Sequence, residues 1–169
     1  GVRLSTSETA KTAHTGSNRS IQEKEEDVVG SEITVVDKDT ETVDVRNKSG
    51  YVRLKLTISD VTTPGQMSVQ PVDSIEDNVL WRPALIGTHH AVQINSGHAY
   101  YLKVYVPNLS SDVTIQGMDS LLWALSEAEM TTVNERTKNH FEDLRFEVSR
   151  ILRKLVEDLP DPEFDNNGN

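Results

Sequence analysis

The chain has 169 residues, no cysteine and a formal net charge of -10. This length fits one domain of ordinary size with short appendages, because compact domains most often contain roughly 100–150 residues. The lack of cysteine excludes disulfide bonds, thiolate zinc sites and cysteine nucleophiles.

The acidic excess is concentrated at one end, where residues 157–169 carry five acidic and no basic side chains. No basic stripe occurs in the sequence, so direct binding of nucleic acid is not expected. No stretch reaches the roughly 18 consecutive apolar residues that a membrane helix needs, so we expect a soluble protein without a membrane span. The chain begins with Gly1, which favours a product cut from a larger precursor or an engineered start.

Residues 1–27 are rich in Ser, Thr, Asn and charged side chains and contain almost no apolar side chains. Such a segment buries too little apolar surface to offset the entropy that it loses on ordering. We therefore predict a flexible N-terminal arm.

Residues 28–117 alternate between apolar and polar side chains with a period of two, as half-buried β-strands do. In residues 51–58, for example, Val52 and Leu54 point to one side and Arg53 points to the other. The predicted strands cover residues 32–36, 42–46, 51–58, 67–72, 79–81, 91–94, 100–106 and 113–115. Many short strands separated by turn residues favour an antiparallel β-sandwich, with a jelly-roll-like arrangement among the options.

Residues 94–108 read INSGHAYYLKVYVPN. Part of this stretch resembles the corner and following strand of fibronectin type III domains, whose pattern is Leu-x-Pro-Gly-x-x-Tyr-x-Val-x-Val and then Asn. The matching positions are Ile94, Ser96, Gly97, Tyr100, Leu102, Val104 and Asn108. Ser96 stands where that family has proline, and the tryptophan of an earlier strand is missing. The resemblance implies an immunoglobulin/fibronectin III-like sandwich in which the Tyr100 hydroxyl bonds back across the corner.

The period changes after Gly117, and residues 118–159 are predicted to form a C-terminal helical segment. Apolar residues recur there at spacings of three and four, so they share one side of an amphipathic helix. This apolar row consists of Phe141, Leu144, Val148, Ile151, Leu152, Leu155 and Leu159. The row can pack on the sandwich of its own chain or on a second subunit, and its length tilts the interpretation towards association.

Residues 160–169 follow the end of this helix and are acidic, so we predict a disordered tail. Glu163, Asp165 and Asn167 have the spacing of the first half of a calcium-binding loop. The bidentate glutamate that completes such a loop is missing, so an acidic tail is favoured over calcium binding.

Three histidines raise the hypothesis of a metal site. His89 and His90 are neighbours, and a strand directs neighbouring side chains to opposite faces. His98 could approach one of them, with Asp112 as a third ligand. Partly exposed histidines near turns explain all three more simply, so we expect no metal and no cofactor.

A serine triad is a second enzymatic hypothesis. His98, Asp112 and either Ser110 or Ser111 supply the residue types. The sequence lacks the Gly-x-Ser-x-Gly turn that exposes such a nucleophile, and a turn explains the two serines better. We therefore expect that the protein is not an enzyme.

Three Asn-x-Ser/Thr sequons occur, at Asn18, Asn47 and Asn108. Each falls in a predicted arm or turn and could carry a glycan in a secreted chain. Chance alone yields sequons in a sequence rich in Ser and Thr, so they do not decide the compartment.

These patterns favour a non-enzymatic assembly protein, a β-sandwich subunit that forms a homo-oligomer, or binds another protein, through its apolar row. The arm and the first residue fit a processed virion (capsid) or other surface-assembly component. The alternative is a carbohydrate- or ligand-binding module, in which Trp81, Tyr101 and Tyr105 form an aromatic platform for sugar rings. A metalloenzyme or hydrolase based on the histidines is the third interpretation.

Overall fold

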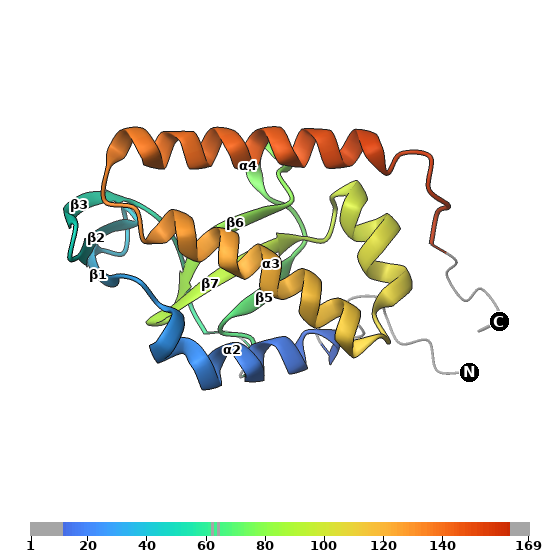
Figure 1. The fold of residues 1–169 in the computed structure, drawn as a ribbon, viewed down its shortest axis with the longest axis horizontal. Coiled ribbons are helices and arrows are strands. Elements are labelled where there is room, and N and C mark those ends of the chain that lie inside the picture. Colours follow the sequence, from blue (N-terminus) through green and yellow to red (C-terminus); the bar gives the residue numbers. More distant parts are fainter. Residues whose placement is uncertain (1–11, 62, 64, 163–169) are drawn as a thin grey trace.

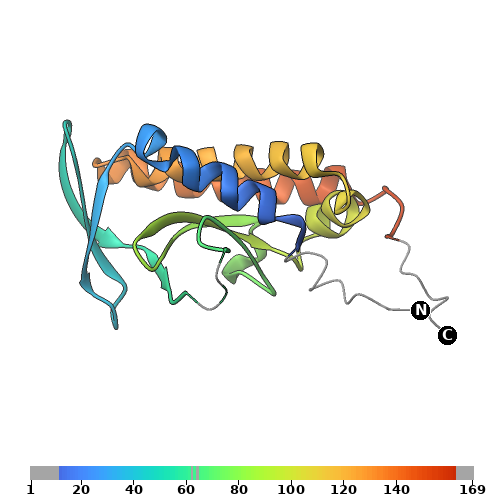
Figure 2. The ribbon, with the colours of Figure 1, turned by 90° about the horizontal axis from the view of Figure 1, so that it is seen from below.

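A computed structural model describes residues 12–61, 63 and 65–162. In this part of the chain, two separate sheets and three long helices form a mixed α/β fold (Figure 1). The sheets lie side by side, and the helices lie along the larger one (Figures 1 and 2).

The smaller sheet is an antiparallel meander of β1 (Glu32–Asp37), β2 (Thr42–Asn47) and β3 (Gly50–Lys55). The turn between β2 and β3 is closed by Asn47, whose side-chain oxygen accepts the amide of Ser49 at 2.8 Å. Alternation along the strands buries Val43 and Val52 in a cluster that includes Met130 of a helix.

The larger sheet contains β4 (Thr57–Ser59), β5 (Val69–Val72), β6 (Trp81–Ile86) and β7 (His89–Asn95), in the order β4-β6-β7-β5. β6 and β7 form an antiparallel hairpin whose turn uses Gly87 with a φ of 62°. β4 and β5 pair in parallel with β6 and β7 at the two edges. β3 continues through Leu56 into β4, so one extended segment belongs to both sheets.

The helical layer consists of α2 (Thr15–Val28), α3 (Asp112–Met130) and α4 (Glu135–Leu155), which cover one face of the larger sheet (Figures 1 and 2). In the main core, Trp81, Val92 and Ile94 of the sheet pack with Ile115 and Trp123 of α3. No helix in the described ranges is both long enough and apolar enough to cross a bilayer.

Polar side chains dock α2 on the sheet. Asn18 is buried, and its amide nitrogen donates to the carbonyl oxygens of His14 and Val69, both at 3.0 Å. Its side-chain oxygen accepts the amides of Ser68 and Val69, both at 2.8 Å. Ile21 adds the apolar contact with the main core. The helix is therefore held mainly by hydrogen bonds at a strand edge.

The prediction of a flexible arm is wrong for the described residues 12–27, most of which belong to α2. This segment has too few apolar side chains to indicate packing. It is anchored instead by polar side chains that have hydrogen-bond partners in the fold. Residues 1–11 lie outside the described residues.

The prediction of a β-sandwich followed by one helix is also wrong in its details, although the strands at residues 32–36, 42–46 and 91–94 are confirmed. Residues 101–105 form a π-helical turn, and residues 113–115 lie inside α3. Tyr101 and Tyr105 are four residues apart, so a helical turn buries both on one side. A strand would have buried Leu102, which is 37% exposed.

Three further predictions concern the Tyr100 hydroxyl, the start of the helical segment and the acidic tail. The Tyr100 hydroxyl donates to the Met118 sulfur at 3.8 Å instead of bonding back across a strand corner. The helical segment begins at Asp112, before the predicted start at residue 118, and is split into α3 and α4. The calcium-loop residues of the acidic tail, within 163–169, lie outside the described residues.

We predict that Asn18→Ala lowers the free energy of unfolding by about 3 kcal/mol, because the amides of Ser68 and Val69 and the carbonyl of Val69 lose their partner. Urea denaturation followed by circular dichroism measures the change. Asn139→Ala, at an exposed position of α4, is the matched control and should change stability by less than about 0.5 kcal/mol. Equal effects of the two substitutions would contradict this role for Asn18.

Candidate functional site

The apolar row of α4 is sheltered along one edge and open along the other. Val148 and Leu152 are half-buried and pack against the main core. Leu144, Ile151 and Leu155 are 45%, 41% and 71% exposed. Two further members of the row lie towards its ends, the half-buried Phe141 and the exposed Leu159. The described part of the chain therefore covers only part of the row.

Polar contacts decide which side of α4 faces the protein. Ser149 is fully buried, and its hydroxyl oxygen accepts the amide of Leu80 at 2.9 Å. Its carbonyl oxygen accepts the Nε2 proton of His98 at 2.9 Å. The Tyr100 amide donates to Nδ1 of the same ring at 2.9 Å, which fixes the proton of neutral His98 on Nε2. Burial lowers the pKa of His98, with a smaller contribution from the charge of Arg153.

A second anchor is a buried carboxylate held by two cations. Glu129, at the end of α3, is 2% exposed. It accepts hydrogen bonds from Arg145 at 3.1 and 3.0 Å, one to each oxygen, and from Lys138 Nζ at 3.2 Å. These contacts tie α3 to α4 and fix the rotation of α4, so the exposed edge of the row is set by charges at its opposite side.

A third polar cluster joins the start of α2 to α3. Asp119 accepts from His14 Nδ1 and from the Ser17 hydroxyl, both at 2.6 Å, and from the Tyr105 hydroxyl at 3.0 Å. The Tyr101 hydroxyl lies 3.2 Å from His14 Nε2, and the two tyrosine rings stack with centroids 4.8 Å apart. None of these five side chains is more than 1% exposed.

This third cluster has Ser, His and Asp but not the geometry of a nucleophilic triad. The Ser17 hydroxyl binds the carboxylate and not the imidazole, so no base is placed to deprotonate it. Burial and the neighbouring Asp119 carboxylate raise the pKa of both Tyr101 and Tyr105, which keeps their hydroxyls protonated as donors. The cluster is closed to solvent, and we assign it to stabilising the core.

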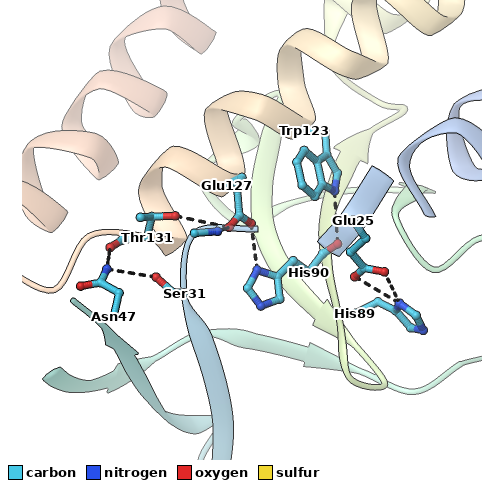
Figure 3. A network of polar contacts seen from close by, with 9 residues as sticks. Glu25, Ser31, Asn47, His89, His90, Trp123, Glu127 and Thr131 are labelled. Carbon is cyan, nitrogen blue, oxygen red and sulfur yellow. Dashed lines mark hydrogen bonds and ion pairs between the residues drawn. The ribbon is translucent and has the colours of Figure 1, made fainter. Parts of the chain in front are cut away.

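A fourth network connects α3 to β7 and to the segment before β1 (Figure 3). Glu127 lies 2.8 Å from Nδ1 of His90. Its other carboxylate oxygen accepts the Gly30 amide at 2.9 Å. The Trp123 indole nitrogen donates to the backbone oxygen of His90 at 3.2 Å. Gly30 is required here, because a Cβ atom would lie 2.7 Å from the Thr131 hydroxyl.

The same network extends at both ends (Figure 3). His89, which points away from His90, lies 3.0 Å from the carboxylate of Glu25 on α2. At the other end, Asn47 of β2 donates to the backbone oxygen of Thr131 at 2.6 Å. The smaller sheet is therefore attached to the end of α3 by a side chain from its β2–β3 turn.

The structure does not form the predicted aromatic platform. Trp81, Tyr101 and Tyr105 are at most 1% exposed and belong to the main core. The prediction assumed that residues 100–106 form a strand with an outward face. The π-helical turn instead directs both tyrosines inward.

The predicted metal and triad residues are not brought together. His89, His90 and His98 each have a different partner. Within the described residues, no group of three His, Cys, Asp or Glu side chains could hold a metal ion. Asp112 is exposed at the start of α3, and both ring nitrogens of His98 are occupied.

The three sequon asparagines are all engaged in hydrogen bonds. Asn18 and Asn47 bind backbone groups as described above, and Asn108 donates to the Val104 carbonyl at 2.7 Å. Asn18 is 1% exposed, so a glycan at this position is incompatible with the fold.

Comparison of the chain with protein-family models, curated proteins and solved structures found no match. The functional argument therefore depends on the residues themselves.

Sequence reasoning missed the three buried carboxylates of α3. Asp119 lies on the same face as Ile115 and Leu122, so an acidic residue inside an apolar helical stripe was the available signal. The apolar stripe of α3 was not recognised, because residues 113–115 in its first turn were predicted to form a strand. The partners of these carboxylates could not be predicted, since His14 and His90 are distant in the sequence.

We predict that Glu129→Gln lowers the free energy of unfolding by about 3 kcal/mol, because Lys138 and Arg145 lose their buried counter-charge. Chemical denaturation measures the loss. Glu147→Gln breaks an exposed pair with Arg150 and should leave the free energy of unfolding nearly unchanged. A similar loss of stability in both variants would show that the contacts of Glu129 with Lys138 and Arg145 do not anchor α4.

We predict that stability falls with acidification partly through His98. Because the folded pKa is lowered, only the unfolded state gains this proton as pH drops below the unfolded value, so the contribution present at neutral pH is lost in acid. The free energy of unfolding of His98→Gln should therefore fall less between about pH 7 and about pH 5. His140→Gln removes an exposed histidine of α4 and should retain the wild-type slope. Identical slopes for all three proteins would refute the assignment.

Proposed function

We propose that this protein is a non-enzymatic assembly subunit that pairs with a second copy of itself through the open edge of the apolar row. The supporting observation is the exposure of Leu144, Ile151 and Leu155 on a helix whose opposite side is fixed by buried polar contacts. On α3, which lies beside α4, Leu121 adds a further apolar side chain that is 62% exposed.

The spacing of the row fits an antiparallel pair of α4 helices. Residues 141, 144, 148, 151 and 155 follow the alternating spacing of a coiled-coil seam. In an antiparallel pair, Leu144 of one copy meets Leu155 of the other, and the exposed Ile151 meets the part of Val148 that its own core leaves uncovered. Such an interface is isologous, so each contact occurs twice and the assembly closes as a dimer.

Charges beside the row support the antiparallel order. Glu147 and Lys154 both flank it on the outer side of α4, and antiparallel pairing places Glu147 of one copy next to Lys154 of the other. Within one chain these side chains form exposed ion pairs with Arg150 and Glu157. Exposed pairs contribute little, so exchanging them for pairs between copies costs little.

The apolar area gives an order of magnitude for the affinity. The exposed parts of Leu121, Leu144, Ile151 and Leu155 amount to about two whole leucine side chains in each copy. Burying both copies contributes about 6–12 kcal/mol. Association costs roughly 4–15 kcal/mol, so the favourable ends of the two ranges leave about 8 kcal/mol, and this area supports a dissociation constant no tighter than micromolar. The virion or surface-assembly setting depends on composition alone and stays a prediction.

We predict a concentration-dependent dimer in sedimentation velocity experiments at tens of micromolar, about the expected dissociation constant. The double variant Leu144→Ser with Leu155→Ser should be monomeric and folded, because the two side chains are 45% and 71% exposed and neither belongs to the main core. Val113→Ser is the control, since Val113 is 85% exposed on α3 but lies outside the row. A wild-type protein that stays monomeric at about 100 micromolar, or an unchanged dimer in the double variant, would refute the proposal.

A further inference from the structure

A cleft of about 500 Å³ opens at one edge of the larger sheet. β4 pairs only with residues 84–86 of β6, so the edge of β6 at Arg82 and Pro83 faces the cleft. The other walls come from the β1–β2 turn, the β3–β4 junction, the turn before β6 and α4. No residue of the apolar row lines it, so the cleft is distinct from the proposed dimer surface. Its volume is within the range of roughly 300–1,000 Å³ that is usual for small-molecule sites.

The deep part of the cleft carries an excess of positive charge. Arg82, Lys138 and Arg145 line it and are buried or half-buried, whereas Glu129 is the only carboxylate among the buried lining residues. Glu129 accepts hydrogen bonds from Lys138 and Arg145 but not from Arg82. Among the buried and half-buried lining residues, one carboxylate therefore compensates three partly desolvated cations.

Arg82 is the cation with the least compensation. Its Nε donates to the neutral amide oxygen of Gln93 at 2.8 Å, and no carboxylate of the described residues forms an ion pair with it. Burial lowers the pKa of Arg82, the carboxylates of Glu41 and Glu76 raise it and the charge of Arg145 lowers it, and the net shift is downward because burial is the largest of these effects. A guanidinium in this state favours an anionic partner, which a carboxylate can supply through two parallel hydrogen bonds.

The rim of the cleft has the opposite charge. Its exposed lining residues carry five carboxylates, those of Glu41, Glu76, Asp77, Glu142 and Asp143, against one cation, Lys55, and none of these side chains forms an ion pair within the described residues. A purely anionic ligand would be repelled on entry, and a purely cationic one would be repelled by the deep part. Between the two, Leu56, Ile75 and Val79 are buried apolar lining residues.

We propose that this cleft binds a small zwitterion of the amino-acid type. The carboxylate of the ligand lies against Arg82 and Arg145, the ammonium group lies among the rim carboxylates, and the carbon chain packs on the apolar walls between them. Two rim residues, Glu41 and Asp77, have φ values of 54° and 60°, so the backbone is held in an uncommon conformation at this place.

Titrations monitored by amide NMR shifts of the full chain test the proposal. The zwitterionic probes are glycine, 4-aminobutyrate and 6-aminohexanoate, which differ only in the spacing of their charges. Hexanoate and hexylamine carry one charge each. We expect at least one zwitterion to shift the resonances of the cleft residues and to bind at least about ten-fold more tightly than either singly charged probe. Equal binding of hexanoate, or no binding of any zwitterion at millimolar concentration, would overturn the proposal.

Substitutions separate the two ends of the ligand. Arg82→Gln should weaken the best zwitterion at least about ten-fold, as expected for the loss of one charge-assisted contact. The double variant Glu142→Gln with Asp143→Asn changes only exposed side chains, so it folds, and it should weaken the zwitterion without weakening hexanoate. Unchanged affinity in this double variant would overturn the proposal even if Arg82→Gln fails to fold.

Two controls complete the set. Arg53→Gln removes an exposed arginine of β3 that pairs with Asp44 of β2 and does not line the cleft, and it should leave binding unchanged. The monomeric variant Leu144→Ser with Leu155→Ser should also bind normally, because the cleft is formed within one chain. Loss of binding in either control would contradict a site located in this cleft.

Discussion

The fold depends on the compensation of three carboxylates that α3 carries into the interior. Asp119, Glu127 and Glu129 are at most 6% exposed, and each has a hydrogen-bonding or ion-pair partner from another part of the chain. The partners come from the N-terminal helix, from β7 and from α4. A buried carboxylate without its partner is strongly destabilising, so each of these elements has one permitted position against α3. α3 therefore acts as the reference to which the other layers are aligned.

This arrangement explains why an amphipathic helix leaves part of its apolar side in solvent. If apolar burial alone positioned α4, the whole row would turn inward. The hydroxyl of Ser149 and the carboxylate of Glu129 instead fix a rotation in which only one edge of the row is covered. Breaking a hydrogen bond inside an apolar region costs much free energy. Keeping these contacts can therefore outweigh the free energy that burying one or two leucine side chains would contribute. The exposed edge is a consequence of anchoring, and the proposed association depends on it.

The sequence predicted the parts of the structure that depend on local periodicity. Strands with clear alternation, such as residues 42–46, were found with boundaries correct to a few residues, and the apolar row marked the amphipathic side of α4, although the predicted segment 118–159 was not divided into two helices. Residues 100–106 misled the interpretation, because their alternation coexists with the four-residue spacing of Tyr101 and Tyr105, and burial against Asp119 decides between the two. α2 was missed because its anchors are polar. The members of the apolar row could be named from spacing, whereas the exposed edge depends on contacts between distant segments.

The segment shared by β3 and β4 has a mechanical consequence. Residues 55–57 lead from one sheet into the other, and all three also form part of the cleft wall. The smaller sheet and this wall of the cleft are therefore built on the same three residues, so a substitution that displaces Leu56, which is 6% exposed and packs in the cluster of the smaller sheet, should change the shape of the cleft as well.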